Sequence, residues 1–166
     1  MRFTYCPQCG KKTILRNIGD EGNISFCSAC NLALWDIFRT CVIVAVVNEN
    51  NEVALLRQGY VSEHMVCVAG VIKFGESPEA TALREVKEEL GLDVVSLSYV
   101  AGYPYAEKDL LMLGYKAVVK KDAFRLSSEV DAAAWIKFAD ALPLMREGSI
   151  AKTLVAKVID DICGKA

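Results

Sequence analysis

Hydrophobic and polar positions alternate in blocks along the chain, and after residue 38 these blocks predict one mixed α/β domain. Residues 40–47 form a nearly continuous apolar run, which is typical of a strand covered on both faces. The polar turn 48–51 separates this run from a second strand at 52–57, and the two together predict a hairpin. Further strands are expected at four ranges, namely 65–69, 94–100, 110–119 and 133–138.

Two helices complete this pattern. The first is predicted over 77–90, because Ser77 is a good N-cap and Pro78 suits the first helical position. Gly91 is the residue type that most often ends a helix. An amphipathic stretch at 149–163 predicts the second helix.

The first predicted helix carries a cluster of carboxylates. We expect its buried stripe to consist of Leu83, Val86 and Leu90. At 100° per residue, three glutamates fall on the opposite, exposed side, namely Glu85, Glu88 and Glu89. Glu85 and Glu89 form a like-charge i,i+4 pair, which costs a helix roughly a few tenths of a kcal/mol. Such a cluster indicates a site for a hard divalent cation such as Mg²⁺. The alternative is an ordinary solvated face, in which Arg84 pairs with Glu88.

Residues 1–37 behave as a separate module. They contain two CxxC pairs, formed by Cys6, Cys9, Cys27 and Cys30, with 17 residues between the pairs. A segment this short cannot bury enough apolar surface to fold unaided, and four thiolates on one Zn²⁺ would supply the missing stability. The rival interpretations are a redox CxxC motif and plain buried cysteines. The three other cysteines lie in apolar patterns and are expected in the core, namely Cys41, Cys67 and Cys163.

Composition and charge narrow the choice of function class. The 166 residues are 53% hydrophobic and 24% charged, which is a globular composition rather than a disordered one. Nineteen Lys and Arg against 21 Asp and Glu give a net charge of −2, so no strong field draws the chain to nucleic acid or membranes. No apolar run approaches the roughly 18 residues that span a bilayer. The first residues lack a secretory hydrophobic region, so a cytoplasmic location is expected.

The region around the first helix resembles a known motif. Gly70, five residues, Glu76, seven residues and the run 84–92 (Arg-Glu-Val-Lys-Glu-Glu-Leu-Gly-Leu) fill all nine specified positions of the Nudix box. This resemblance implies an α/β/α sandwich around a mixed sheet over residues 38–166, preceded by the Cys₄ zinc ribbon at 1–37. It also implies hydrolysis of a nucleoside diphosphate linked to another group, with Mg²⁺ or Mn²⁺ as the catalytic cofactor.

The same resemblance assigns roles to individual residues. The catalytic residues and principal metal ligands would be Glu85, Glu88 and Glu89, with one of them also polarising the attacking water. The backbone carbonyl of Ala69 would add a metal ligand. The structural positions of the box would be Gly70, Glu76, Arg84 and Gly91, with Glu76 and Arg84 bracing the loop against the helix.

A Cys₄ ribbon directly before such a domain resembles the NADH pyrophosphatase subfamily. Residues 111–115 and 149–152 are similar to later segments of that subfamily, which implies that Ala151 contacts substrate. Glu129, six residues before Trp135, matches a later acidic metal ligand of the subfamily. The alternative for Glu129 is an ordinary loop glutamate. The chain does not show the further N-terminal domain of full-length members, so we expect a shortened version.

The chain departs from the subfamily at its specificity motif, which would fall on residues 102–110. Only Pro104 is retained there, and Tyr105 stands in for a tryptophan. The resemblance therefore implies that Pro104 and Tyr105 contact substrate, with the Tyr105 ring stacking on a base or a nicotinamide. The alternative is that Tyr103 and Tyr105 only pack a loop.

Three functions remain open from the sequence. The first is a pyrophosphatase acting on NADH, NAD or a related dinucleotide, with NAD-capped RNA as a further candidate substrate. The second is a pyrophosphatase for ADP-ribose or another nucleotide-sugar. The third is a nucleotide-sensing Nudix module whose ribbon binds nucleic acid or protein. The resemblance also implies a homodimer, and no membrane partner is expected.

Overall fold

The computed structural model describes residues 3–59 and 62–164 of the chain. Two compact units are present. The first comprises Met1–Arg39 together with Glu107–Asp109, and the second comprises Thr40–Ala106 and Leu110–Ala166. Within the described ranges, no helix is both long enough and apolar enough to cross a membrane.

The first unit is a small three-stranded antiparallel sheet in the order β1-β2-β3. Its strands are β1 (Ile14–Asn17), β2 (Asn23–Cys27) and β3 (Leu32–Leu34), with the 3-10 helix η1 (Gly19–Glu21) joining the first two. Among the described residues of this unit, Phe26 is buried, and the core cluster consists of Cys6, Cys27 and Leu34. Phe3 and Cys30 pack against them. So small an apolar core agrees with the expectation that the module needs further stabilisation.

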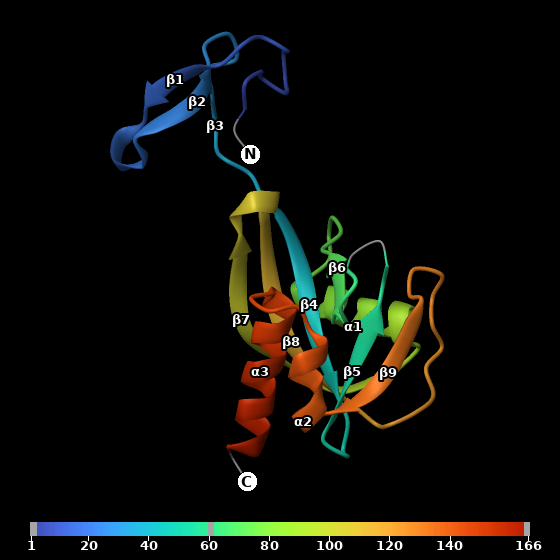
Figure 1. Cartoon of the computed structure of the whole chain (residues 1–166). Helices are drawn as coiled ribbons and strands as arrows, with labels where there is room; N and C mark the ends of the chain where they lie inside the picture. Colours follow the sequence, from blue (N-terminus) through green and yellow to red (C-terminus); the bar gives the residue numbers. More distant parts are fainter. Residues whose placement is uncertain (1–2, 60–61, 165–166) are drawn as a thin grey trace. The chain divides into compact units, whose positions relative to one another are not determined.

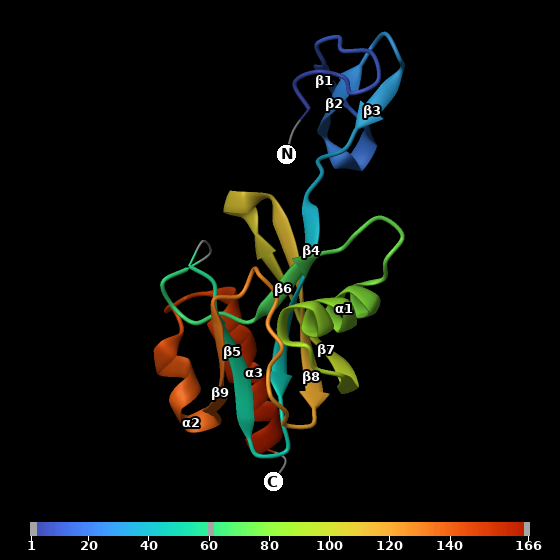
Figure 2. The same cartoon turned by 90° about the vertical axis from the view of Figure 1, so that its right-hand side faces the viewer.

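A six-stranded sheet forms the centre of the second unit. Its main path has the order β7-β8-β4-β5-β9, and β6 pairs with β4 beside that path. Its strands are β4 (Arg39–Val47), β5 (Glu52–Arg57), β6 (Val68–Val71), β7 (Val94–Tyr105), β8 (Leu110–Val119) and β9 (Ala132–Lys137). The pairs β4–β5, β4–β6, β5–β9 and β7–β8 are antiparallel. Figure 2 shows β4 and β8 running in the same direction, so the sheet is mixed.

Helices cover both faces of this sheet. Helix α1 (Pro78–Leu90) lies on one face, whereas α2 (Phe138–Ala141) and α3 (Ile150–Cys163) lie on the other (Figures 1 and 2). Residues of β4 alternate between the two cores: Val42, Val44 and Val46 share one cluster with α1. The intervening Ile43, Ala45 and Val47 share the other cluster with α2 and α3. The predicted α/β/α sandwich is therefore confirmed.

The predicted buried stripe of α1 is only partly correct. Val86 and Leu90 are fully buried, whereas Leu83 is 44% exposed, and Ala82 is buried in the same core. A hydrophobic side chain at position 83 was expected to face the sheet, but the helix instead turns its small residue at 82 inward. Hydrophobicity alone therefore misplaced the orientation of this helix.

Other sequence expectations need correction. β7 continues to Tyr105 instead of ending at residue 100, so residues 102–105 are strand and not loop. Pro104 fits within this strand because β7 is the edge strand of the sheet, and an edge strand tolerates proline. The strand expected at 65–69 is observed as β6 at Val68–Val71. Cys163 is exposed at the end of α3, although Cys41 and Cys67 are buried as expected.

Candidate functional site

Helix α1 has well-formed ends that place its glutamates. The Ser77 hydroxyl accepts a hydrogen bond from the Ala80 backbone N–H at 3.1 Å, and Pro78 occupies the first helical position. At the other end Gly91 has φ 72°, and its N–H donates to the Lys87 carbonyl. This left-handed conformation favours glycine, so the glycine at position 91 explains why the helix ends here. The first turn of α1 follows directly from the loop that leaves β6.

Glu89 is the most buried carboxylate of the cluster, with 4% of its surface exposed. Its Oε1 accepts a hydrogen bond of 3.3 Å from Gln58 Nε2. Its Oε2 is buried and has no hydrogen-bond partner in the part of the chain that the structure describes. Burial, together with the nearby charges of Glu85 and Glu129, raises the pKa of Glu89 to about 7, although the hydrogen bond from Gln58 opposes this rise.

Glu85 is also buried, so the expectation of an exposed carboxylate face is wrong for Glu85 and Glu89. The physical reason lies in β6, against which α1 packs. A Cβ placed on Gly70 would overlap the Glu85 carboxyl group, so the glycine leaves the space that this side chain fills. Burial raises the pKa of Glu85 even though Arg84 Nη1 lies 2.7 Å from its Oε1.

Arg84 connects the preceding loop to the helix. Its Nε and Nη2 lie 2.8 and 2.9 Å from the two carboxylate oxygens of Glu76, and Thr81 Oγ1 donates to Glu76 at 2.8 Å. The Arg84 guanidinium holds the pKa of Glu76 at about 2. Nη1 also lies 2.9 Å from Glu88 Oε2, so the ion pair considered as an alternative for Glu88 is present. Half of the Glu88 side chain nevertheless remains exposed.

Two further expected metal ligands lie near Glu89. Glu129 is exposed on the segment between β8 and β9, and its charge acts on Glu89. The backbone of Ala69, in β6, lies near Glu89 and lowers its pKa slightly against the stronger effect of burial. Carboxylate and carbonyl oxygens with one buried, unpartnered oxygen fit a hard divalent cation. The glutamates do not meet as closely as the cysteines, which are the only metal-binding group with mutually close ligand atoms among the described residues.

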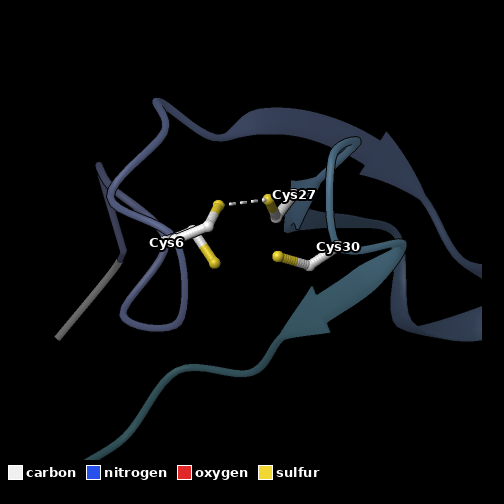
Figure 3. A group of neighbouring side chains, drawn as sticks. Cys6, Cys27 and Cys30 are labelled. Carbon is white, nitrogen blue, oxygen red and sulfur yellow. Dashed lines mark hydrogen bonds between the residues drawn. The ribbon is translucent and has the colours of Figure 1, made fainter.

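The two CxxC pairs meet in the first unit. The four cysteine sulfurs all lie within 4.8 Å of one another, and the Sγ atoms of Cys9 and Cys27 are 3.6 Å apart. Figure 3 shows Cys6, Cys27 and Cys30 converging from separate parts of this module. A hydrogen bond from the Cys30 backbone N–H lowers the pKa of Cys27 to about 7, whereas the hydrogen bond with Cys9 and burial raise the pKa of Cys30 to about 12. Four convergent sulfurs fit tetrahedral Zn²⁺.

The residues expected to contact substrate lie apart from the carboxylates. Ala151 is buried in the first turn of α3, on the α2–α3 face of the sheet, whereas α1 covers the opposite face. Pro104 is exposed and Tyr105 is partly exposed at the end of β7. It is Tyr103 that is buried in the same core as Ala151, and its hydroxyl has no partner among the described residues.

Sequence reasoning missed two residues that organise this site. Gln58 directly follows β5, and its burial became apparent only in the folded structure. Arg125 donates from Nη2 to the Gly91 carbonyl at 2.9 Å, and its backbone N–H donates to the Leu90 carbonyl at 2.9 Å. It thereby joins the segment that carries Glu129 to the end of α1. No local pattern indicated that contact.

Comparisons with known proteins identify the family. Residues 37–157 match the model of the NUDIX domain family. The chain is 30% identical over 164 residues to the NAD-capped RNA hydrolase NudC of Vibrio atlanticus, covering 98% of this chain and 59% of that protein. It is 29% identical over 153 residues to the protein of the same name from Pseudomonas aeruginosa, covering 91% and 54%. The chain thus spans less than two thirds of the length of these relatives.

Solved structures show the same fold. A NUDIX hydrolase from Nitrosomonas europaea superimposes with a TM-score of 0.75 at 19% identity, covering 98% of this chain and 93% of that one. The NUDIX domain of Shewanella oneidensis NrtR, complexed with ADP ribose, gives a TM-score of 0.67 at 16% identity, with coverages of 77% and 90%. At these identities the likeness establishes the architecture only.

Proposed function

The chain belongs to the Nudix hydrolase family, and from that premise we propose that it hydrolyses the pyrophosphate bond of a nucleoside diphosphate derivative. NADH, NAD or a related dinucleotide is the first candidate substrate, in keeping with the names of its relatives. We assign residues 38–166 to the hydrolase domain and residues 1–37 to a zinc ribbon.

One observation carries the proposal, namely the buried Glu89 Oε2 without a hydrogen-bond partner among the described residues. A buried carboxylate oxygen that lacks a partner costs free energy, so a purely structural glutamate would be expected to have one. A divalent cation would satisfy this oxygen. The proposed ligands of Mg²⁺ or Mn²⁺ are Glu85, Glu88, Glu89, Glu129 and the carbonyl of Ala69.

When bound, the cation would stabilise the negative charge that develops on the diphosphate during hydrolysis. The chain itself contributes positioning. Helix α1 presents three carboxylates from one rigid element, and the Arg84–Glu76 ion pair fastens the preceding loop to it. The burial of Glu85 and Glu89 excludes water from one side of the site. One of the three helix carboxylates accepts a proton from the attacking water.

A substrate panel tests this proposal. The purified protein would be incubated with NADH, NAD, ADP-ribose, FAD, diadenosine polyphosphates and NAD-capped RNA, each with Mg²⁺ or Mn²⁺. We expect metal-dependent release of two monophosphates from at least one dinucleotide. A preference for ADP-ribose would favour the nucleotide-sugar alternative. Tight binding without hydrolysis of any compound would instead support a nucleotide sensor and overturn the proposal.

The remaining assignments concern the ribbon and the assembly. We infer that Cys6, Cys9, Cys27 and Cys30 hold one structural Zn²⁺. We also infer a cytoplasmic homodimer without a membrane partner. Light scattering at micromolar concentration tests the dimer, and a monomeric mass would contradict it.

A further inference from the structure

Gln58 is a buried amide beside the most buried carboxylate of the site. It directly follows β5 and is 5% exposed, so its polar side chain requires a partner. Its Nε2 donates to Glu89 Oε1 at 3.3 Å, and this contact joins residues 31 positions apart in the sequence. The Gln58 backbone carbonyl accepts from the Ser62 N–H at 3.1 Å, which holds the backbone of Gln58 at the start of the following loop.

The charges around Glu89 show why a neutral partner matters. The carboxylates of Glu85 and Glu129 face Glu89 and repel it. Arg84 neutralises Glu85 and Glu88 through direct ion pairs, but among the described residues it forms no ion pair with Glu89. Gln58 therefore holds the Glu89 carboxylate through a hydrogen bond without cancelling its charge. That bond reaches one oxygen only and leaves Oε2 without a partner in the described part of the chain.

We propose that Gln58 is a positioning residue, which fixes the Glu89 carboxylate so that its full charge and its Oε2 face a divalent cation. This inference rests on the proposed function, because it takes Glu89 as a metal ligand. A side chain that orients a metal ligand typically changes metal affinity by about 10–100-fold when it is removed. Gln58 would act through Glu89 and would not touch the substrate.

The test measures the Kd of the Gln58→Met protein for Mn²⁺. The electron paramagnetic resonance signal of free Mn²⁺ reports how much of the ion is unbound. Methionine has a similar length but cannot donate a hydrogen bond. We expect the Kd for Mn²⁺ to rise about tenfold or more. We also expect kcat at a fixed, subsaturating Mn²⁺ concentration to fall while the KM for the nucleotide changes less than twofold.

A matched control removes a similar hydrogen bond elsewhere on the same helix. The Tyr115 hydroxyl donates to Glu79 Oε1 at 2.8 Å, and Tyr115 is likewise buried. Tyr115→Phe should therefore leave the Kd for Mn²⁺ within twofold of the wild type. If Tyr115→Phe weakens Mn²⁺ binding as much as Gln58→Met does, the effect comes from general destabilisation and the inference is overturned.

A double-mutant cycle distinguishes a positioning role of Gln58 from general destabilisation. In the Glu89→Gln background the ligand is already lost, so adding Gln58→Met should change the Kd less than twofold. If each substitution raises the Kd for Mn²⁺ by the same factor whether or not the other is present, the inference is overturned. Failure of the proposed function has a different signature, because the wild type would then bind no Mn²⁺ and hydrolyse no compound of the panel. A wild type that binds Mn²⁺ and hydrolyses substrate, with an unchanged Gln58→Met Kd, overturns only the role of Gln58.

Discussion

Replacing Glu89 by glutamine should stabilise the metal-free protein at neutral pH. Glu89 is buried, lies near two other carboxylates and forms no ion pair with a cationic side chain among the described residues. Burial raises its pKa from the ordinary 4.5 to about 7. A carboxyl group whose pKa is raised by folding destabilises the folded state once the pH exceeds its unfolded pKa. Glutamine has nearly the same shape and carries no charge.

The size of this effect follows from the pKa shift. At about 1.36 kcal/mol per pKa unit, the rise sets an upper bound of roughly 3 kcal/mol, and residual solvation lowers the expected value to roughly 1–3 kcal/mol. The penalty develops between pH 4.5 and about 7 and is constant above that range. At pH 5 the two proteins should therefore differ little. At pH 8 the Glu89→Gln protein should unfold roughly 2–12 °C higher than the wild type.

The assay is thermal unfolding of chelator-treated wild type and Glu89→Gln at pH 5 and pH 8. The Glu79→Gln protein is the control, since Glu79 is exposed on the same helix and its amide can still accept from Tyr115. A Glu89→Gln protein that is less stable than the wild type at pH 8 would refute the reasoning, because Glu89 would then have a stabilising partner in the folded state.

Four further predictions follow from other parts of the molecule. Elemental analysis should find about one Zn²⁺ per chain, and Cys9→Ser should lower that content; zinc-free protein at purification would contradict the ribbon assignment. Gly70→Ala should reduce hydrolysis at least tenfold, since its Cβ would displace the Glu85 carboxyl group, and wild-type turnover would count against this packing. Glu52→Gln should lower the stability to urea more at pH 7 than at pH 3. Two lysine ammonium groups hold the pKa of Glu52 at about 2, below its ordinary value of 4.5. The stability that the Glu52 carboxylate supplies above pH 4.5 is therefore lost as the pH falls toward 2. A difference that grows at pH 3 would exclude this ion pairing. Tyr105→Ala should raise the KM for a dinucleotide roughly tenfold with little change in kcat if its ring stacks on substrate; an unchanged KM would leave Tyr105 with a packing role.

The features that the sequence predicted well are encoded locally. The limits of α1 follow from a hydroxyl at Ser77 and a left-handed glycine at Gly91, and both act within one turn of the helix. The two CxxC pairs likewise bring their sulfurs together because each pair forms its own short turn. The apolar run that became β4 is buried on both faces, as its composition indicated.

The features that the sequence did not predict depend on distant packing. The burial of Glu85 requires the space above Gly70 in β6, and a helical projection contains no information about that strand. The contact between Gln58 and Glu89 spans 31 positions and was therefore invisible to any local pattern. Residues 102–105 were expected beyond the end of the strand, whereas pairing with β8 makes them part of it.

The central claim is that the carboxylates of α1 hold the divalent cation that drives pyrophosphate hydrolysis. The most direct measurement compares turnover of the best dinucleotide by wild type, Glu89→Gln and Glu79→Gln at saturating Mn²⁺, with the released monophosphates separated by chromatography. Loss of one ligand carboxylate should raise the barrier by about 3–5 kcal/mol, so Glu89→Gln should lose roughly two to four orders of magnitude in rate while Glu79→Gln retains wild-type turnover. A Glu89→Gln protein that keeps more than about a tenth of wild-type turnover, which corresponds to a barrier change below roughly 1.4 kcal/mol, would contradict the claim.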